Sequence, residues 1–211
     1  DNLAFGSSVS YTRSDFSSLL PDDALPLLSL SKTPLPSNSA RLPIPLSPSC
    51  NTPAWRGTLA LRTSSAICSY QGELEPFPSQ ATLLSFIPFL QFNNNIINYM
   101  LFVNLESTPI KRESTLKFYN AKSLTSLGST LIHSNSITVI SLDEFSCHSS
   151  DLLIAKSLTM SGIPIFLSMS SDLSSLSLEH THPPSSFLIH GNRWASQKLI
   201  KSLWFSKLSQ S

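Results

Sequence analysis

The sequence predicts a mainly β protein: an antiparallel two-sheet sandwich, jelly-roll-like, of about seven to nine strands, with an extended proline-rich N-terminal arm and a C-terminal α-helix. Three observations predict it. Short, often alternating apolar runs separated by Ser, Asn, Gly and Pro fill residues 55–190. Eight of the fifteen prolines lie before residue 55, and apolar residues recur at three- and four-residue intervals after residue 190. The 211 residues thus divide into an arm (1–54), a sandwich (55–190) and a terminal helix (191–211).

The arm is defined by its prolines. Proline removes a backbone donor and biases the preceding residue to extended conformations, so residues 1–54 are predicted to be neither helix nor central strand. The alternation of Leu and Ile with Pro over residues 42–46 suits a polyproline-like strip along the surface of the domain or of a neighbouring chain. The arm has three basic and four acidic residues, so it is not a basic arm for nucleic acid.

Nine segments of the middle region have the alternation or apolar content of β-strands: Thr58–Tyr70, Ala81–Phe92, Ile97–Leu105, Ser114–Tyr119, Ser129–His133, Ile137–Leu142, Ile163–Met169, Ser174–His182 and Ser186–His190. Asn93–Asn95 and His133–Ser136 are predicted hairpin turns, because Asn tolerates left-handed backbone. Asp151–Met160 is predicted to be a helix, with a polar cap at its start. Lys111–Glu113 is predicted to be a solvated turn.

The C-terminal helix is the clearest helical pattern in the chain, with Asn192 as a possible cap. Lys201 and Lys207 fall within its apolar arc. This placement favours packing on the sandwich, with the lysine stems along the apolar surface, over attachment to an anionic membrane.

Composition excludes several classes of function. A net charge of +1 with 13% charged residues gives no field to hold a polyanion, so no nucleic-acid partner is predicted. No stretch approaches 18 apolar residues and no signal peptide is visible, so no transmembrane segment is predicted and the compartment stays open. The six glycines are too far apart for a nucleotide-phosphate loop.

The serines and cysteines carry little information about chemistry. The 43 serines are spread through the chain, so the presence of Ser, His and Asp does not indicate a catalytic triad. Cys50, Cys68 and Cys147 match no zinc or redox spacing. We expect three small buried or half-buried hydrophobic residues, with one disulfide plus a free thiol as the alternative.

One stretch concentrates charged, imidazole and aromatic side chains, the usual material of a ligand site at one end of a sandwich. Its candidate ligand-binding residues are Glu179, His180, His182, His190, Arg193 and Trp194. Alternate residues of a strand share a face, so His180 and His182 are predicted to lie on the core side with Leu176 and Leu178. Such a pair can hold a divalent metal ion, with His190 as third ligand if the turn after His182 has five residues.

Three classes of function follow. The preferred interpretation is a non-catalytic binding or assembly domain for a carbohydrate, peptide or protein ligand, with no cofactor. The first alternative is a small metal-dependent β-barrel enzyme that uses His180, His182 and His190. The second is a structural or coat-type protein whose arm exchanges between subunits and makes a homo-oligomer.

Overall fold

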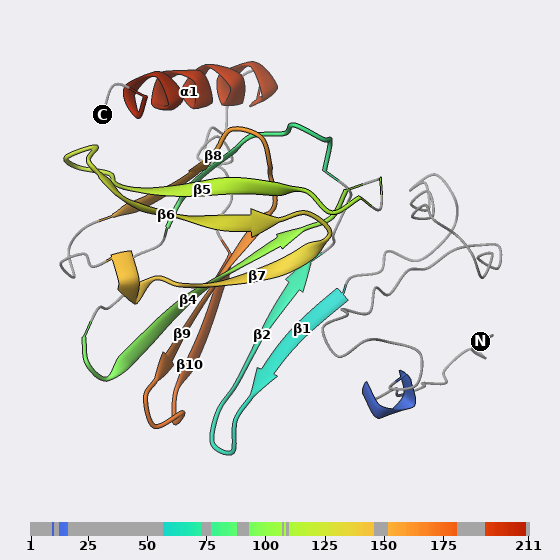
Figure 1. Cartoon of the computed structure of the whole chain (residues 1–211). Coiled ribbons are helices and arrows are strands. Elements are labelled where there is room, and N and C mark those ends of the chain that lie inside the picture. Colours follow the sequence, from blue (N-terminus) through green and yellow to red (C-terminus); the bar gives the residue numbers. More distant parts are fainter. Residues whose placement is uncertain are drawn as a thin grey trace.

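The computed structural model describes residues 10, 13–16, 57–72, 77–87, 93–106, 108, 110–145, 152–180 and 193–209. In these residues the protein is mainly β, as predicted: two four-stranded antiparallel sheets face each other, and a two-stranded hairpin and one C-terminal helix flank them (Figure 1). Almost all of the predicted arm lies outside the described residues, apart from residue 10 and a short 3-10 helix, η1 (Arg13–Phe16).

The two sheets are built from eight strands. Sheet I has the order β3-β8-β5-β6, made of β3 (Leu83–Phe86), β8 (Leu153–Ser157), β5 (Glu113–Asn120) and β6 (Ser126–His133). Sheet II has the order β10-β9-β4-β7, made of β10 (Leu176–His180), β9 (Ile163–Ser170), β4 (Ile96–Asn104) and β7 (Ser136–Ser141). The hairpin of β1 (Gly57–Arg62) and β2 (Ile67–Gly72) lies beside β10.

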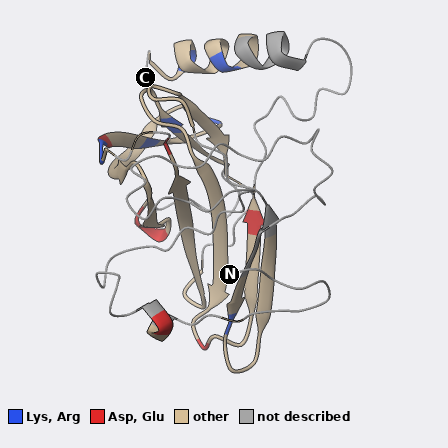
Figure 2. Ribbon diagram, turned by 90° about the vertical axis from the view of Figure 1, so that its right-hand side faces the viewer, with Lys and Arg blue, Asp and Glu red and all other residues tan. Residues whose placement is uncertain are grey.

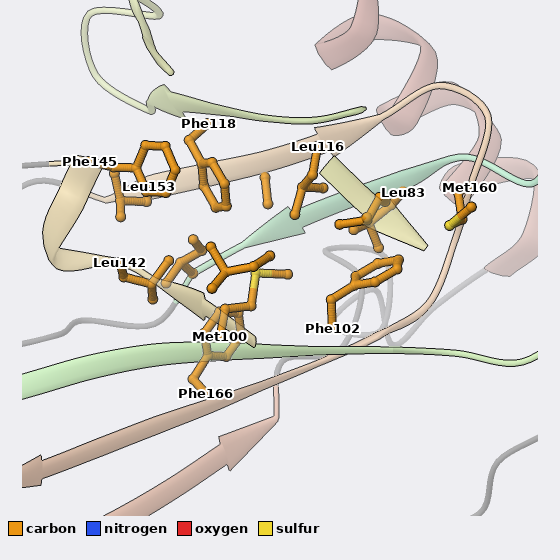
Figure 3. Close-up of a cluster of buried hydrophobic side chains, with 14 residues drawn as sticks. Leu83, Met100, Phe102, Leu116, Phe118, Leu142, Phe145, Leu153, Met160 and Phe166 are labelled. Atoms are coloured by element: carbon orange, nitrogen blue, oxygen red, sulfur yellow. The ribbon is translucent and has the colours of Figure 1, made fainter. Parts of the chain in front are cut away.

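The main core fills the space between the sheets (Figure 3). Each strand sends alternate side chains inward, so sheet II contributes Met100, Phe102 and Phe166, which face Leu116 and Phe118 of sheet I. A short 3-10 helix, η2 (Asp143–Phe145), closes one end with the ring of Phe145, stacked on Phe118 at 4.1 Å between centroids. Burial of these large side chains is the principal stabilising term of the sandwich.

A second apolar layer lies on the outer face of sheet I, beneath α1 (Arg193–Lys207) (Figure 1). Leu208, which follows the helix, is buried with Leu84 and Ile154, and the ring of Trp204 meets that of Phe86 at 4.9 Å. Lys201 Nζ donates to the carbonyl of Thr82. The helix is therefore where the sequence predicted it, packed on the sandwich.

The predicted helix Asp151–Met160 is wrong, because its middle is strand β8. All five residues of β8 are buried, since the core covers one face of this strand and α1 covers the outer face of its sheet. A strand that is buried on both faces lacks the alternation that marks a half-buried strand, and its continuous apolar run resembles a buried helix.

Both predicted turns exist, but neither joins a hairpin. Asn93–Asn95 precedes β4 of sheet II, whereas the preceding strand, β3, lies in sheet I. His133–Ser136 carries the chain from β6 of sheet I to β7 of sheet II, with Asn135 in the left-handed region at φ 52°. These turns cross between the layers of the sandwich instead of pairing neighbouring strands.

The predicted strand Thr58–Tyr70 is the hairpin β1–β2. Its turn contains no Gly, Pro or Asn; instead the Thr63 hydroxyl accepts from the backbone N–H of Ala66 at 3.0 Å, so the sequence carried only the weaker turn signal of Thr63, Ser64 and Ser65. The predicted strand Ser186–His190, together with Cys50 and Cys147, lies outside the described residues. Cys68 of β2 is a free, half-buried cysteine. None of the helical segments in the described ranges is long and apolar enough to cross a membrane.

Candidate functional site

The predicted site residues are divided between elements. Glu179 and His180 end β10, and Arg193 and Trp194 begin α1, the helix that packs on the other sheet. His182 and His190 lie outside the described residues. Of the predicted site residues, the structure describes the side chains of Glu179 and His180 only.

His180 does not point toward the main core, which corrects the expectation that it would lie on the core side. It pairs with Ile165 of β9, whereas Glu179 pairs with Phe166, whose ring belongs to the main core. Because neighbouring residues of a strand face opposite sides, Leu176, Leu178 and His180 lie on the outer face of sheet II. The alternation of residues correctly predicted that Leu176, Leu178 and His180 share one face of the strand. It could not predict which face lies toward the core, because sheet II has apolar residues on both faces.

The half-buried imidazole of His180 meets the ring of Tyr70 of β2 edge to face, with 5.2 Å between centroids. Burial raises the pKa of the Tyr70 hydroxyl above its ordinary value. Within the described ranges no three His, Cys, Asp or Glu side chains group as a metal site would need. The metal site of His180, His182 and His190 stays a prediction.

The outer face of sheet II is apolar from one edge to the other. The strand register aligns Val139, Leu101, Ile165 and His180 in one row across β7, β4, β9 and β10. The complete face consists of Ile97, Tyr99, Leu101, Val103, Ile137, Val139, Ser141, Ile163, Ile165, Leu167, Met169, Leu176, Leu178 and His180. The four strands contain one Asp, Glu, Lys or Arg, which is Glu179, and Figure 2 shows their ribbons mostly in tan.

Exposure on this face increases toward β7. Ile165 of β9 is buried, whereas Ile137 and Val139 of β7 have 41% and 62% of their surface exposed. The hairpin β1–β2 lies at the opposite edge, beside β10. The accessible part of the face is therefore the half formed by β4 and β7.

The outer faces of the two sheets differ in how they are covered. On sheet I, α1 covers the apolar residues Leu84, Tyr119 and Ile154, and the neighbouring part of β5 presents exposed Glu113 and Lys117 to solvent. In the part of the chain that the structure describes, no helix lies over sheet II. An apolar sheet face with an accessible half is unusual for a surface that only faces water.

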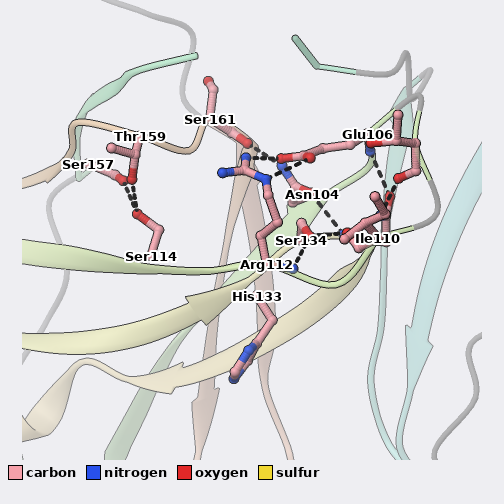
Figure 4. Close-up of polar contacts among 12 residues, drawn as sticks. Asn104, Glu106, Ile110, Arg112, Ser114, His133, Ser134, Ser157, Thr159 and Ser161 are labelled. Carbon is pink, nitrogen blue, oxygen red and sulfur yellow. Dashed lines mark hydrogen bonds and ion pairs between the residues drawn. The ribbon is translucent and has the colours of Figure 1, made fainter. Parts of the chain in front are cut away.

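A second group of polar residues lies where the β4–β5 connection meets the β6–β7 turn (Figure 4). Arg112 Nε lies 3.1 Å from Glu106 Oε2, and its Nη2 contacts the other carboxylate oxygen at 2.5 Å. Hydrogen bonding to Glu106 raises the pKa of Arg112. The prediction that residues 111–113 form a solvated turn is therefore wrong for Arg112.

Asn135 links this ion pair to its surroundings. Its Oδ1 accepts from the backbone N–H of Glu106 at 2.8 Å, and its Nδ2 donates to the carbonyls of Thr108 and Ile110. Asn104 donates in turn to the carbonyl of Ser161 at 2.6 Å. Because the buried polar groups of Asn104, Glu106 and Asn135 have partners in the protein, we interpret the cluster as a structural clamp on three loops and not as a ligand site.

The described residues thus define an antiparallel β-sandwich with one helix-covered and one partly accessible apolar sheet face. No protein-family model, no curated protein and no solved structure matches the chain.

The apolar face was not predicted from the sequence, in which the charged and aromatic residues near Glu179 are the most conspicuous candidate for a site. A signal was present in β4, whose apolar residues occupy both inward positions, such as Met100 and Phe102, and outward ones, such as Leu101 and Val103. An antiparallel strand with solvent on one side normally alternates with polar residues.

Proposed function

We propose that this chain is a non-catalytic binding or assembly domain, and that it uses the outer face of sheet II to contact a protein partner. The contrast between the two sheets carries the proposal. On the outer face of sheet I, α1 covers Leu84, Tyr119 and Ile154 and leaves Leu131 of β6 exposed, whereas sheet II has two exposed apolar residues side by side on one strand, Ile137 and Val139 of β7. Contiguous exposed apolar patches are typical of interaction sites.

The chemistry of the face favours a protein over a carbohydrate. Its accessible half is mostly aliphatic, with Leu101, Val103, Ile137 and Val139, and the hydroxyls of Tyr99 and Ser141 are its few donors or acceptors for sugar hydroxyls. An apolar core with a polar rim is the usual composition of a protein interface. Removal of this surface from water by a partner contributes roughly 25 cal/mol per Å² of apolar area.

The polar stretch that begins at Glu179 fits this proposal as one margin of the contact. His180 lies on the outer face itself, and Glu179 precedes it on the opposite face of β10. We propose that His182 and His190, which follow in the sequence, belong to the same margin. Arg193 and Trp194 are left out of it, because they begin α1, the helix that packs on sheet I. Polar rims set orientation and specificity more than affinity.

The proposal is tested by quantitative affinity capture with the full chain as bait, in three versions. Val139→Lys places a charge at the accessible end of the apolar face. Thr115→Lys is the matched control, because Thr115 is an exposed strand residue on the outer face of sheet I. We expect a set of captured proteins, including added copies of this chain, that is shared by the wild type and Thr115→Lys and lost with Val139→Lys. Identical capture by all three versions would overturn the proposal.

A further inference from the structure

The sandwich has four lateral strand edges, and three of them are covered or interrupted. The β1–β2 hairpin lies against β10, with Thr63 Oγ1 donating to the carbonyl of Leu173 at 2.8 Å. Strand β3 has only four residues and meets α1 through Phe86 and Trp204. Strand β6 is interrupted by an extra residue, Leu127, because Phe118 of β5 pairs with Gly128 and the next residue, Tyr119, pairs with Ser126. Short strands, bulges and covering elements are the means by which proteins block edge-to-edge pairing.

Strand β7 has none of these protections in the described residues. It pairs with β4 through six consecutive residues without a register shift, and no other described strand is hydrogen-bonded to it. Its sequence, Ser-Ile-Thr-Val-Ile-Ser, contains no charge, Pro or Gly. Regular, neutral strands rich in β-branched residues are the ones that accept another strand most readily.

One hydrogen bond determines which backbone groups of β7 face the free edge. The N–H of Leu142 donates to the carbonyl of Asn98 at 2.9 Å, which extends the β4–β7 ladder by one pair. Residues of an antiparallel strand direct their backbone groups alternately to the two sides. Ile140 and Thr138 therefore bond to β4, as Leu142 does, and the N–H and C=O groups of Ile137, Val139 and Ser141 point away from it.

From this geometry we infer that β7 pairs antiparallel with β7 of a second copy of this chain, joining two sheets II into one eight-stranded sheet. The inference rests on the proposed function and deepens it, because the joined sheets would continue the same apolar outer face across the dimer. In the register that places Val139 opposite its symmetry mate, Ile137 lies opposite Ser141, and all three direct their backbone groups to the shared edge. Cross-strand pairs of β-branched side chains stabilise such a ladder.

Two properties favour a second copy over a different strand. A two-fold pairing places β7 against an identical strand, and because the strand has no charged residue, no like-charge repulsion opposes the pairing. The contact is also isologous: each sheet II offers β7, and its other edge, β10, has the hairpin beside it. Pairing therefore ends at a dimer and does not extend into a fibre.

The test is the molar mass of the purified full chain by light scattering over a hundredfold range of concentration. We expect the wild type and Thr115→Lys to shift from one to two chain masses as concentration rises. We expect Val139→Lys and Val139→Glu each to stay at one chain mass, and their equimolar mixture to regain two, because opposite charges then face each other across the edge. Circular dichroism and thermal unfolding confirm that each variant is folded.

The outcomes separate this inference from the proposed function. A wild type that stays at one chain mass throughout, or a dimer that both charged variants retain, overturns pairing through β7. If the wild type is monomeric but Val139→Lys still loses a captured protein of another sequence, the sheet face is a binding surface and the partner is not a second copy. If the wild type is monomeric and capture is the same for all baits, both proposals fail.

Discussion

Arg112 contacts both carboxylate oxygens of Glu106, a side chain with only 1% of its surface exposed, while the Arg112 side chain is 31% exposed. The pair lies beside the turn that leads into β7, because the N–H of Glu106 donates to Asn135, the residue immediately before that strand. The ion pair thus holds the start of the strand whose free edge we assign to assembly.

The unequal burial of this pair predicts unequal effects of mutation. Arg112→Ala leaves the buried Glu106 carboxylate without its partner, so we expect a loss of about 3 kcal/mol in the free energy of unfolding. Glu106→Gln leaves Arg112 partly in water, so its loss should be smaller. Glu113→Ala is the matched control: Glu113 is 65% exposed and lies 3.6 Å from His133, and exposed pairs contribute at most about 1 kcal/mol. Urea unfolding measures all three, and equal losses for Arg112→Ala and Glu113→Ala would contradict this description of the clamp.

The surroundings of Lys156 should make the free energy of unfolding depend on pH. Its ammonium group lies between β8 and the end of α1, 3.1 Å from Ser209 Oγ and 5.5 Å from the centroid of Phe205. Burial, reinforced by the charge of Lys117, lowers the pKa of Lys156. The unfolded chain therefore binds this proton more tightly than the folded one, and stability rises as pH increases from the lowered pKa toward the ordinary value.

The variant Lys156→Met isolates this contribution, because the lowered pKa of Lys201 acts in both proteins. We expect the wild type to gain stability relative to Lys156→Met as the pH rises from the lowered pKa of Lys156 toward the ordinary value for lysine. Thermal unfolding across that range measures the difference. A constant difference would show that Lys156 titrates alike in the folded and unfolded chain.

The contact of the C-terminal segment with sheet I should depend on Leu208, the residue directly after α1. Leu208 is 1% exposed among Leu84 and Ile154, so Leu208→Ala should destabilise the protein by about 2–3 kcal/mol. Leu199, 62% exposed within α1, is the control, and Leu199→Ala should change stability by less than about 0.5 kcal/mol. Denaturant midpoints give both values, and similar effects of the two substitutions would mean that the helix does not pack as described.

Gly162 predicts a steric effect at the start of β9. A methyl group there would come within 2.6 Å of the carbonyl oxygen of Val103 and 2.7 Å of the Phe102 ring. Since the ring belongs to the main core and the carbonyl to a central strand, neither can move freely, and Gly162→Ala should cost about 1–3 kcal/mol. An unchanged melting temperature would contradict the close approach of the two segments.

Alternation predicted most strands of the sandwich to within a few residues, because strands such as Glu113–Asn120 are buried on one face only. It failed where both faces are apolar: β8 resembled a helix, and His180 was assigned to the core face. The helix Arg193–Lys207 was predictable because its apolar residues recur at three- and four-residue intervals whatever surface the helix packs on.

The contacts between distant segments, in the Glu106–Arg112 cluster and at the edge of sheet II, were less predictable than the strands themselves. The Glu106–Arg112 pair spans a six-residue separation across a connection, with no motif to mark it. The free edge of β7 depends on the order of strands in sheet II, which places this strand at an edge although its sequence would equally suit a central position. Strand order follows from packing over the whole chain and leaves no local sequence signal.

The central claim, that β7 is a contact edge, is tested most directly by hydrogen exchange at its outward amides. The amides of Ile137, Val139 and Ser141 should exchange slowly in concentrated wild-type protein, faster on dilution, and fast at every concentration in Val139→Lys. The amides of Thr138 and Ile140, which bond to β4, should stay protected in both proteins. Outward amides that exchange as fast in the concentrated wild type as in Val139→Lys would contradict the account.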